Sequence, residues 1–203
     1  ITPAEMPVEE KSSDLFLDFP GNNKEFLESA LTKQILAFTQ SMIEEGVYLL
    51  PENKRLRPKS ISKRFFAAQI SLTLAGKDCG KTVNAKTCLA AATEYGYINK
   101  KTPPAVKIQR TDYYQMILKA KKIPLLQKDQ LPKKICSDVL NKSKHAQVMA
   151  TMRVYDIIRP FKDGSCKPEL ALRRHSALQY AARVSRISDE DIQTITKKEV
   201  IDF

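Results

Sequence analysis

Lysine and arginine side chains gather just before the most apolar stretch of the chain. Six of them lie between Lys54 and Arg64, and a nearly unbroken apolar run over 65–75 follows at once. Long cationic side chains neutralise phosphates and release counterions, so this cluster is typical of nucleic-acid backbone binding. The alternative is that the charges only solvate the entrance of a buried helix.

Further cations extend the predicted surface into the middle and the end of the chain. Some lie in the Pro-containing segment 99–110, and others flank a second apolar helix near residue 143. A solvated charged face explains each of these about as well. The predicted DNA-binding set is Lys54, Arg55, Arg57, Lys59, Lys63, Arg64, Lys100, Lys101, Lys107, Arg110, Lys133, Lys134, Lys142, Lys144, Lys197 and Lys198.

The charge is distributed unevenly over the 203 residues. The net charge is +11, but residues 1–52 carry −7 whereas residues 53–174 carry +19. A positive field of this size concentrates polyanions and speeds their capture. The simpler interpretation is a generically basic surface. The acidic first segment would suit a basic protein partner, or would shield the basic face of the chain itself.

The patterns that mark an enzyme are missing from the sequence. No GxxxxGK[ST] phosphate loop is present, and within the basic block 53–174 no DxD pair suggests a metal-dependent nuclease. A cysteine could pair with His145 or His175 only if folding brought them together, and no local signature supports such a pair. We therefore expect no catalytic residues, no bound metal and no cofactor.

The four cysteines Cys79, Cys88, Cys136 and Cys166 form no CxxC pair. A structural zinc site needs closely spaced ligands, so we expect reduced, buried thiols. The segment ITPAEMPVEE does not resemble a signal peptide, and no apolar stretch approaches the roughly 18 residues that a membrane span needs. These observations predict an intracellular, reducing location, the nucleus.

Helical periodicity of the apolar residues covers nearly the whole chain, and convincing strands are absent. The sequence therefore predicts an all-α protein. Asn84 and the Ser188–Asp191 pair are the expected caps of two of the helices. The predicted helices are 24–45, 60–75, 84–95, 111–122 (capped by Thr111), 129–141, 143–158, 168–184 (Pro168 at its first position) and 189–200.

One segment is echoed about 85 residues further along the chain. KSISKRFFAAQISLTLA begins at Lys59, KSKHAQVMATMRVYDII begins at Lys142, and a Lys-Asp-Gly/Cys turn follows each. A duplicated helical unit would explain both apolar helices and the position of the linker. The predicted organisation is an acidic segment 1–23, a first repeat 24–98, a basic linker 99–110 and a second repeat 111–203.

Two helical repeats, each around a buried central helix, resemble the cyclin-like core of general transcription factor IIB. The segment ARVSRISDEDIQTITKK, residues 182–198, is similar in pattern to the helix-turn-helix that closes the repeats of that family. The resemblance implies a non-enzymatic transcription-initiation factor that binds duplex DNA. It implies TATA-binding protein and RNA polymerase as partners. The acidic residues 189–191 would repel phosphate. The resemblance therefore does not imply that the closing helix recognises DNA bases.

Other functions fit the same sequence. An RNA-binding or viral nucleocapsid-type helical protein is the first alternative, since phosphate capture does not distinguish RNA from DNA. A protein-interaction scaffold without nucleic acid is the next, and a hydrolase the last. A preference for duplex DNA over single-stranded RNA would separate the first two.

Overall fold

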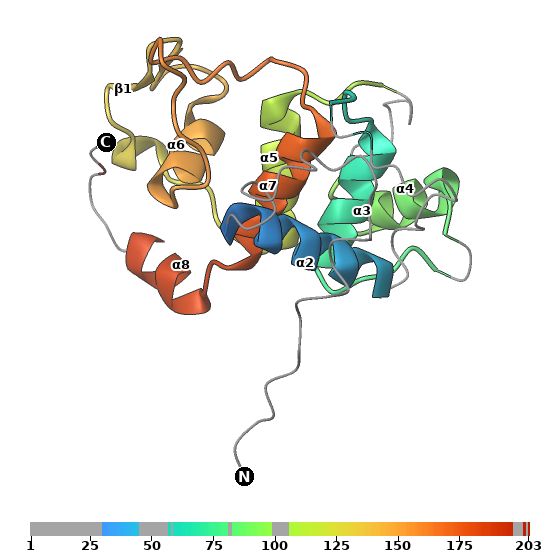
Figure 1. The fold of residues 1–203 in the computed structure, drawn as a ribbon. Helices are drawn as coiled ribbons and strands as arrows, with labels where there is room; N and C mark the ends of the chain where they lie inside the picture. Colours follow the sequence, from blue (N-terminus) through green and yellow to red (C-terminus); the bar gives the residue numbers. More distant parts are fainter. Residues whose placement is uncertain are drawn as a thin grey trace.

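Helices make up most of the structure, which is a computed structural model (Figure 1). It describes residues 30–44, 57, 59–80, 83–98, 106–196, 201 and 203. The mostly helical fold is confirmed, although a small two-stranded sheet is present as well. The helices are α2 (Ala30–Glu44), α3 (Arg64–Leu74), α4 (Ala85–Glu94), α5 (Arg110–Ala120), α6 (Ala146–Val154), α7 (Arg174–Ser185) and α8 (Asp189–Thr196), and the strands are β1 (Lys134–Cys136) and β2 (Val139–Leu140).

Three short extended segments, 60–63, 106–109 and 170–173, pair with one another in a closed cycle that we call the three-segment ring. Ser62 N donates to Leu172 O (2.6 Å), Leu172 N to Ile108 O (3.0 Å), and Ile108 N to Ser62 O (3.1 Å). The three central residues are 0–2% exposed. The ring therefore closes one end of the core with backbone hydrogen bonds.

Each segment of the ring leads directly into a helix that begins with arginine. Arg64 N donates to Val106 O, Arg110 N to Leu170 O and Arg174 N to Ser60 O, at 3.0–3.2 Å. These bonds satisfy a helix-terminal N–H group that has no partner within its own helix. Helices α3, α5 and α7 consequently run away from the ring in the same general direction and pack against one another (Figure 1).

The other elements cover this three-helix centre. Helix α2 crosses α7 and α3, α4 packs on α3, and α6 packs on α5 and on the β1–β2 hairpin (Figure 1). Both helices that the sequence placed at the centre are buried, from Phe66 to Thr73 in α3 and from Val148 to Met152 in α6. Tyr113 is also fully buried and donates its hydroxyl to Ala177 O at 2.6 Å.

Some predicted helix ends are confirmed and others are wrong. Asn84 caps α4 in a reciprocal capping box, and Ser188 exchanges hydrogen bonds with Asp191 at the start of α8. The helix predicted from Pro168 begins only at Arg174, because the ring takes residues 170–173 into its pairing. Thr111 does not cap α5; its hydroxyl donates to Pro168 O.

The helix predicted over 129–141 is wrong. A short 3₁₀ turn (Lys128–Gln130) is followed by the antiparallel pair β1–β2, in which Lys134 faces Leu140 and Cys136 faces Val139. Pro132 lacks a donor for helical hydrogen bonding, which favours this break. Of the predicted linker, residues 99–105 lie outside the described part, and 106–110 belong to the ring and to the start of α5.

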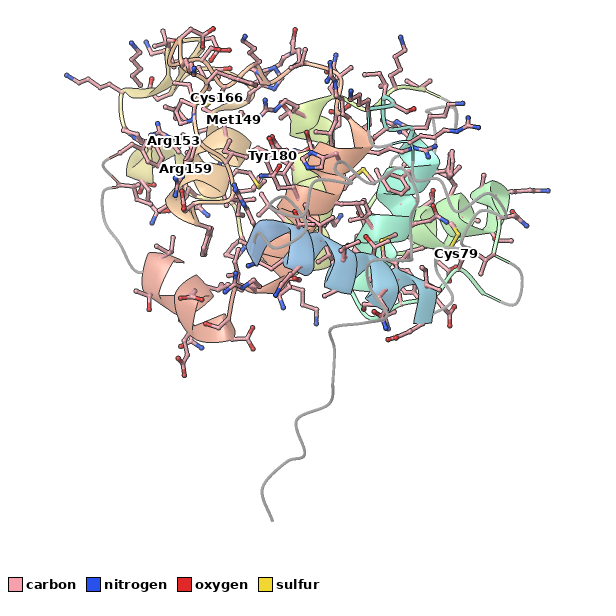
Figure 2. All side chains as sticks on the ribbon, viewed as in Figure 1. Cys79, Met149, Arg153, Arg159, Cys166 and Tyr180 are labelled. Atoms are coloured by element: carbon pink, nitrogen blue, oxygen red, sulfur yellow. A yellow bond between two sulfur atoms is a disulfide. The ribbon has the colours of Figure 1, made fainter. Side chains whose placement is uncertain are left out.

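The prediction of reduced thiols is also wrong. Disulfides join Cys79 to Cys88 and Cys136 to Cys166, and the four described cysteines leave no free thiol (Figure 2). The first bridge ties the end of α3 to α4. The second ties β1 to the segment that leads into the ring. Both pairs meet only through the fold, which is why spacing alone did not reveal them.

Candidate nucleic-acid interface

The outer face of the three-segment ring is basic. Alternation along each segment buries the central residue and turns its two neighbours outward. Lys63, Lys107 and Arg173 are exposed on this face together with the neutral Gln109. The chain brings them together from three positions that are far apart in the sequence.

Lys63 and Lys107 are direct partners in an antiparallel bridge. The Cα atoms of such partners lie roughly 4.5–5.5 Å apart, and like charges in this position repel each other. Within the described part of the chain, no acidic side chain forms a salt bridge with either lysine or with Arg173. An anion that contacts both lysines would relieve this repulsion.

Three helix N-termini reinforce the positive potential of this face. The N-cap residues Lys63, Gln109 and Arg173 are all extended, and none of them accepts a side-chain capping hydrogen bond. Each N-terminus carries a partial positive charge from the helix dipole. Helices α3 and α7 have no acidic residue in their first turn, whereas α5 has Asp112.

The predicted site residues are distributed over two regions. Arg57, Lys59, Lys63 and Lys107 are exposed near or on the ring, and Arg64 is half-buried at the start of α3. Lys133, Lys134, Lys142 and Lys144 are exposed around the hairpin, beside α6, and Lys144 forms an ion pair with Glu169 at 3.0 Å. The predicted sites at Lys54, Arg55, Lys100, Lys101, Lys197 and Lys198 lie outside the described residues.

Arg110 does not lie on the predicted DNA-binding surface, because the residue is only 4% exposed. Its Nε donates to Tyr114 Oη at 2.8 Å, and its Nη2 donates to Tyr180 Oη at 3.2 Å. The guanidinium also lies over the rings of both tyrosines and of Phe161. A buried cation surrounded in this way is a structural group and does not meet a phosphate.

Sequence reasoning missed Arg173, although a signal for it was present. RFFAAQI, RTDYYQM and RHSALQY open α3, α5 and α7, each with arginine first and glutamine sixth. An apolar or small residue two positions before each arginine becomes the buried centre of the ring. This triple pattern relates α3 to α5 and α7, whereas the predicted echo paired α3 with α6.

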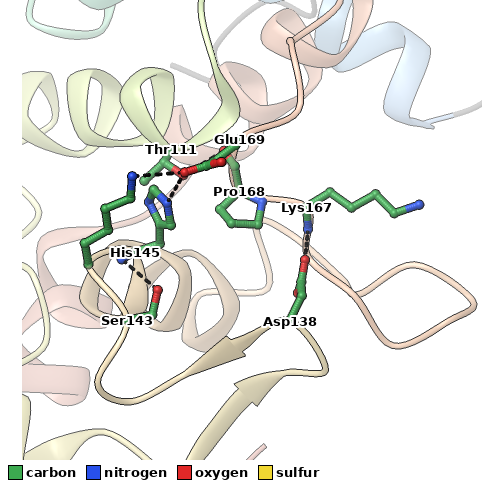
Figure 3. Close-up of polar contacts among 8 residues, drawn as sticks. Thr111, Asp138, Ser143, His145, Lys167, Pro168 and Glu169 are labelled. Carbon is green, nitrogen blue, oxygen red and sulfur yellow. Dashed lines mark hydrogen bonds and ion pairs between the residues drawn. The ribbon is translucent and has the colours of Figure 1, made fainter.

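A second polar cluster lies in an open cleft of about 530 Å³ between the hairpin and the loop before α7 (Figure 3). His145 Nε2 contacts Glu169 Oε1 at 3.2 Å, and Lys144 and His145 together lower the pKa of Glu169. In this described region no nucleophilic side chain is hydrogen-bonded to the imidazole. Ser143 Oγ instead accepts from the backbone N–H of His145.

Asp138 lies in the same region but is committed to the backbone. Its two carboxylate oxygens accept from Cys166 N and Lys167 N at 2.8 Å. It also approaches Cys136 and Cys166, whose sulfur atoms are joined in a disulfide and are therefore not thiolate ligands. This cluster stabilises the hairpin against the following loop.

Comparisons with known proteins give no family for the chain. No family model matches it, and no curated protein is significantly similar to it in sequence. Within the described residues, no helix is both long and apolar enough to cross a membrane.

Proposed function

We propose that this protein is a non-enzymatic nucleic-acid-binding protein that captures the phosphate backbone of duplex DNA on the outer face of the three-segment ring. Phosphate contacts of this kind position a protein on nucleic acid without reading base sequence. The contacts would come from Lys63, Lys107 and Arg173, with Arg57 and Lys59 nearby.

The cross-strand pair of Lys63 and Lys107 carries this proposal. Two exposed like charges are fixed opposite each other by the backbone, at an end of the molecule where three helix dipoles also point their positive ends. A flexible basic tail could separate its charges, but this face cannot. Such a rigid array suits a rigid polyanion, and duplex DNA is stiffer than a single strand.

The resemblance to transcription factor IIB gives a narrower form of the proposal. The buried α3 and α6 would be the centres of two cyclin-like repeats, and DNA protection would depend on TATA-binding protein. The two disulfides weigh against the nuclear location that accompanies this form, because disulfides persist mainly in oxidising compartments. We therefore propose an oxidising compartment and backbone capture without those partners.

The experiment replaces Lys63, Lys107 and Arg173 together by Gln. Because three phosphate contacts would be lost, the slope of log affinity for duplex DNA against log salt should fall in magnitude by up to about 3. The loss of affinity should be similar for unrelated DNA sequences. Fluorescence anisotropy at several salt concentrations measures both effects.

The matched control replaces Lys133, Lys134 and Lys142 by Gln, which removes the same charge from the hairpin region. This control should keep most of the salt slope. Equal losses in the two triple variants would contradict a defined site and would indicate a generic basic surface. Tighter binding of single-stranded RNA or of heparin than of duplex DNA would reject DNA as the preferred polyanion.

A further inference from the structure

The turn that follows strand β2 contains the only Asn-x-Ser/Thr triplet of the chain, Asn141-Lys142-Ser143. This triplet, with any residue except proline in the middle, is the acceptor sequence for asparagine-linked glycosylation. Such triplets also arise by chance. Whether this one can carry a glycan therefore depends on its place in the fold and on the compartment of the protein.

The triplet lies in a β-turn at the surface. Ser143 N donates to Leu140 O at 2.9 Å, which places Asn141 and Lys142 at the two central positions of the turn. Lys142 is exposed and Asn141 is partly exposed. The side-chain amide of Asn141 has no hydrogen-bond partner among the described residues. A substituent on this amide would therefore break no hydrogen bond of the described fold.

An exposed apolar side chain lies directly before Asn141. Leu140 is 58% exposed, more than any other large apolar side chain in the described part of the chain. Its partner across the hairpin is Lys134. A glycan is bulky and hydrophilic, so one on Asn141 would cover Leu140 and keep this end of the hairpin soluble.

The cysteines point to a compartment in which this modification takes place. The four described cysteines form two disulfides and leave no free thiol. Disulfides persist mainly in secreted proteins and in other oxidising environments. An accepted Asn-x-Ser triplet likewise indicates a surface loop of a secreted protein. The disulfides and the triplet are separate features of the chain, and both favour the secretory pathway.

We infer that Asn141 carries an asparagine-linked glycan. This inference rests on the oxidising compartment proposed above and not on the DNA contacts. The donor is an oligosaccharide attached to a polyprenyl diphosphate. Asn141 Nδ2 forms a bond to the anomeric carbon of the first sugar, and the bond from that carbon to the diphosphate oxygen breaks. The diphosphate leaves with the bonding electrons, the nitrogen loses one proton, and nothing is oxidised or reduced.

The hydrogen bonds of the folded turn determine when the glycan is added. Ser143 Oγ accepts from His145 N at 3.2 Å (Figure 3), and Asn141 N donates to Lys133 O at 3.3 Å. Both bonds restrict the acceptor triplet, whose hydroxyl the glycosyltransferase must recognise. The transfer therefore precedes the folding of the hairpin, and the folded turn then holds the glycan at the surface.

The test examines the full chain isolated from its own cells, with the disulfides intact. A peptide N-glycosidase removes an asparagine-linked glycan and leaves aspartate in its place. After treatment the protein should migrate faster in gel electrophoresis, and mass spectrometry should find aspartate at residue 141. Asn84 is the internal control, because Thr87 follows it at three positions and not at two. Asn141 found without a glycan in the untreated protein would overturn the inference.

Variants expressed in the same cells test the triplet itself. Ser143→Thr keeps the hydroxyl and should keep the glycan, whereas Ser143→Ala and Asn141→Gln should each lose it. A glycan that persists in either of the last two variants would lie elsewhere and would also overturn the inference. The readout is independent of DNA binding. A glycosylated protein that fails to bind DNA would reject only the proposed function, and an unmodified Asn141 with the expected salt slope would reject only the glycan.

Discussion

His175 is the second residue of α7 and is partly buried, and burial lowers the pKa of its imidazole below the ordinary value of 6.5. The unfolded chain therefore binds a proton at a higher pH than the folded protein does. The contribution of this histidine to stability is complete above about pH 6.5 and is lost as the pH falls toward its lower folded pKa.

We predict that His175→Gln reduces the loss of stability between pH 7.5 and pH 5.5. Chemical denaturation at the two pH values measures the difference in the free energy of unfolding. The carboxyl groups of lowered pKa, such as Asp156 and Asp191, titrate below this window and do not interfere. A variant with the same pH dependence as the wild-type protein would contradict the role of His175.

The buried and the exposed cations of this protein differ in side-chain chemistry. Arg110 and Lys107 are three residues apart, yet one is enclosed by aromatic rings and the other is exposed on the ring face. The planar guanidinium has several donors and stacks on rings, so it tolerates burial when those donors find acceptors. Lysine has a compact, strongly hydrated charge and remains at the surface.

At the scale of elements, four helices in the described part of the chain are followed by a residue in the left-handed conformation. Gly76 (φ +60°) follows α3 and Gly96 (φ +73°) follows α4, but Lys122 (φ +58°) follows α5 and Asp156 (φ +51°) follows α6. In each case a backbone N–H beyond the helix donates to a carbonyl of its last turn, as Ile123 N does to Leu118 O. Residues with a Cβ atom are strained in this conformation.

We predict that Lys122→Gly stabilises the protein by about 1 kcal/mol, because it removes this strain. Lys122 is exposed, so no packing is lost. Urea denaturation measures the free energy of unfolding. The matched control is Lys121→Gly, where φ is −82° and glycine should bring no gain. If both substitutions destabilise equally, strain at Lys122 does not limit the stability.

At the scale of the whole molecule, the two disulfides close loops of different length. Cys136 and Cys166 are 30 residues apart, whereas Cys79 and Cys88 are 9 residues apart. Closing the longer loop removes more conformational entropy from the unfolded chain. The expected contributions to stability are about 4 and about 3 kcal/mol, respectively.

We therefore predict that the double substitution Cys136→Ala, Cys166→Ala destabilises the protein more than Cys79→Ala, Cys88→Ala does. Thermal denaturation with and without a reducing agent measures this difference. A variant that lacks all four cysteines is the control, and the reducing agent should not change its melting temperature. If contacts in the folded protein, and not loop closure, determined the loss of stability, the Cys79→Ala, Cys88→Ala variant would be the less stable of the two.

The local features of the fold follow from the sequence by itself. The apolar run 65–75 forms most of the buried α3, and Asn84 and Ser188 cap their helices. Of the basic cluster before that run, Arg57, Lys59 and Lys63 are exposed and Arg64 is half-buried. Each of these depends on residues within a few positions of one another. Helical periodicity and side-chain capping act over that distance, so they can be recognised without a structure.

Only the tertiary structure decided how distant segments meet. The segments of the three-segment ring are too short to show a strand pattern. Their central residues find their hydrogen-bond partners 46–110 residues away, as Ile108 does in Ser62 and Leu172. Disulfide pairing and the burial of Arg110 depend on the same long-range packing. Hydrogen bonding across the ring and the exclusion of water from the core act between residues that are close in space, whatever their distance along the chain. As a result, Arg110 of the predicted linker is buried in the core, and Lys107 and Arg173 lie on the same face as Lys63.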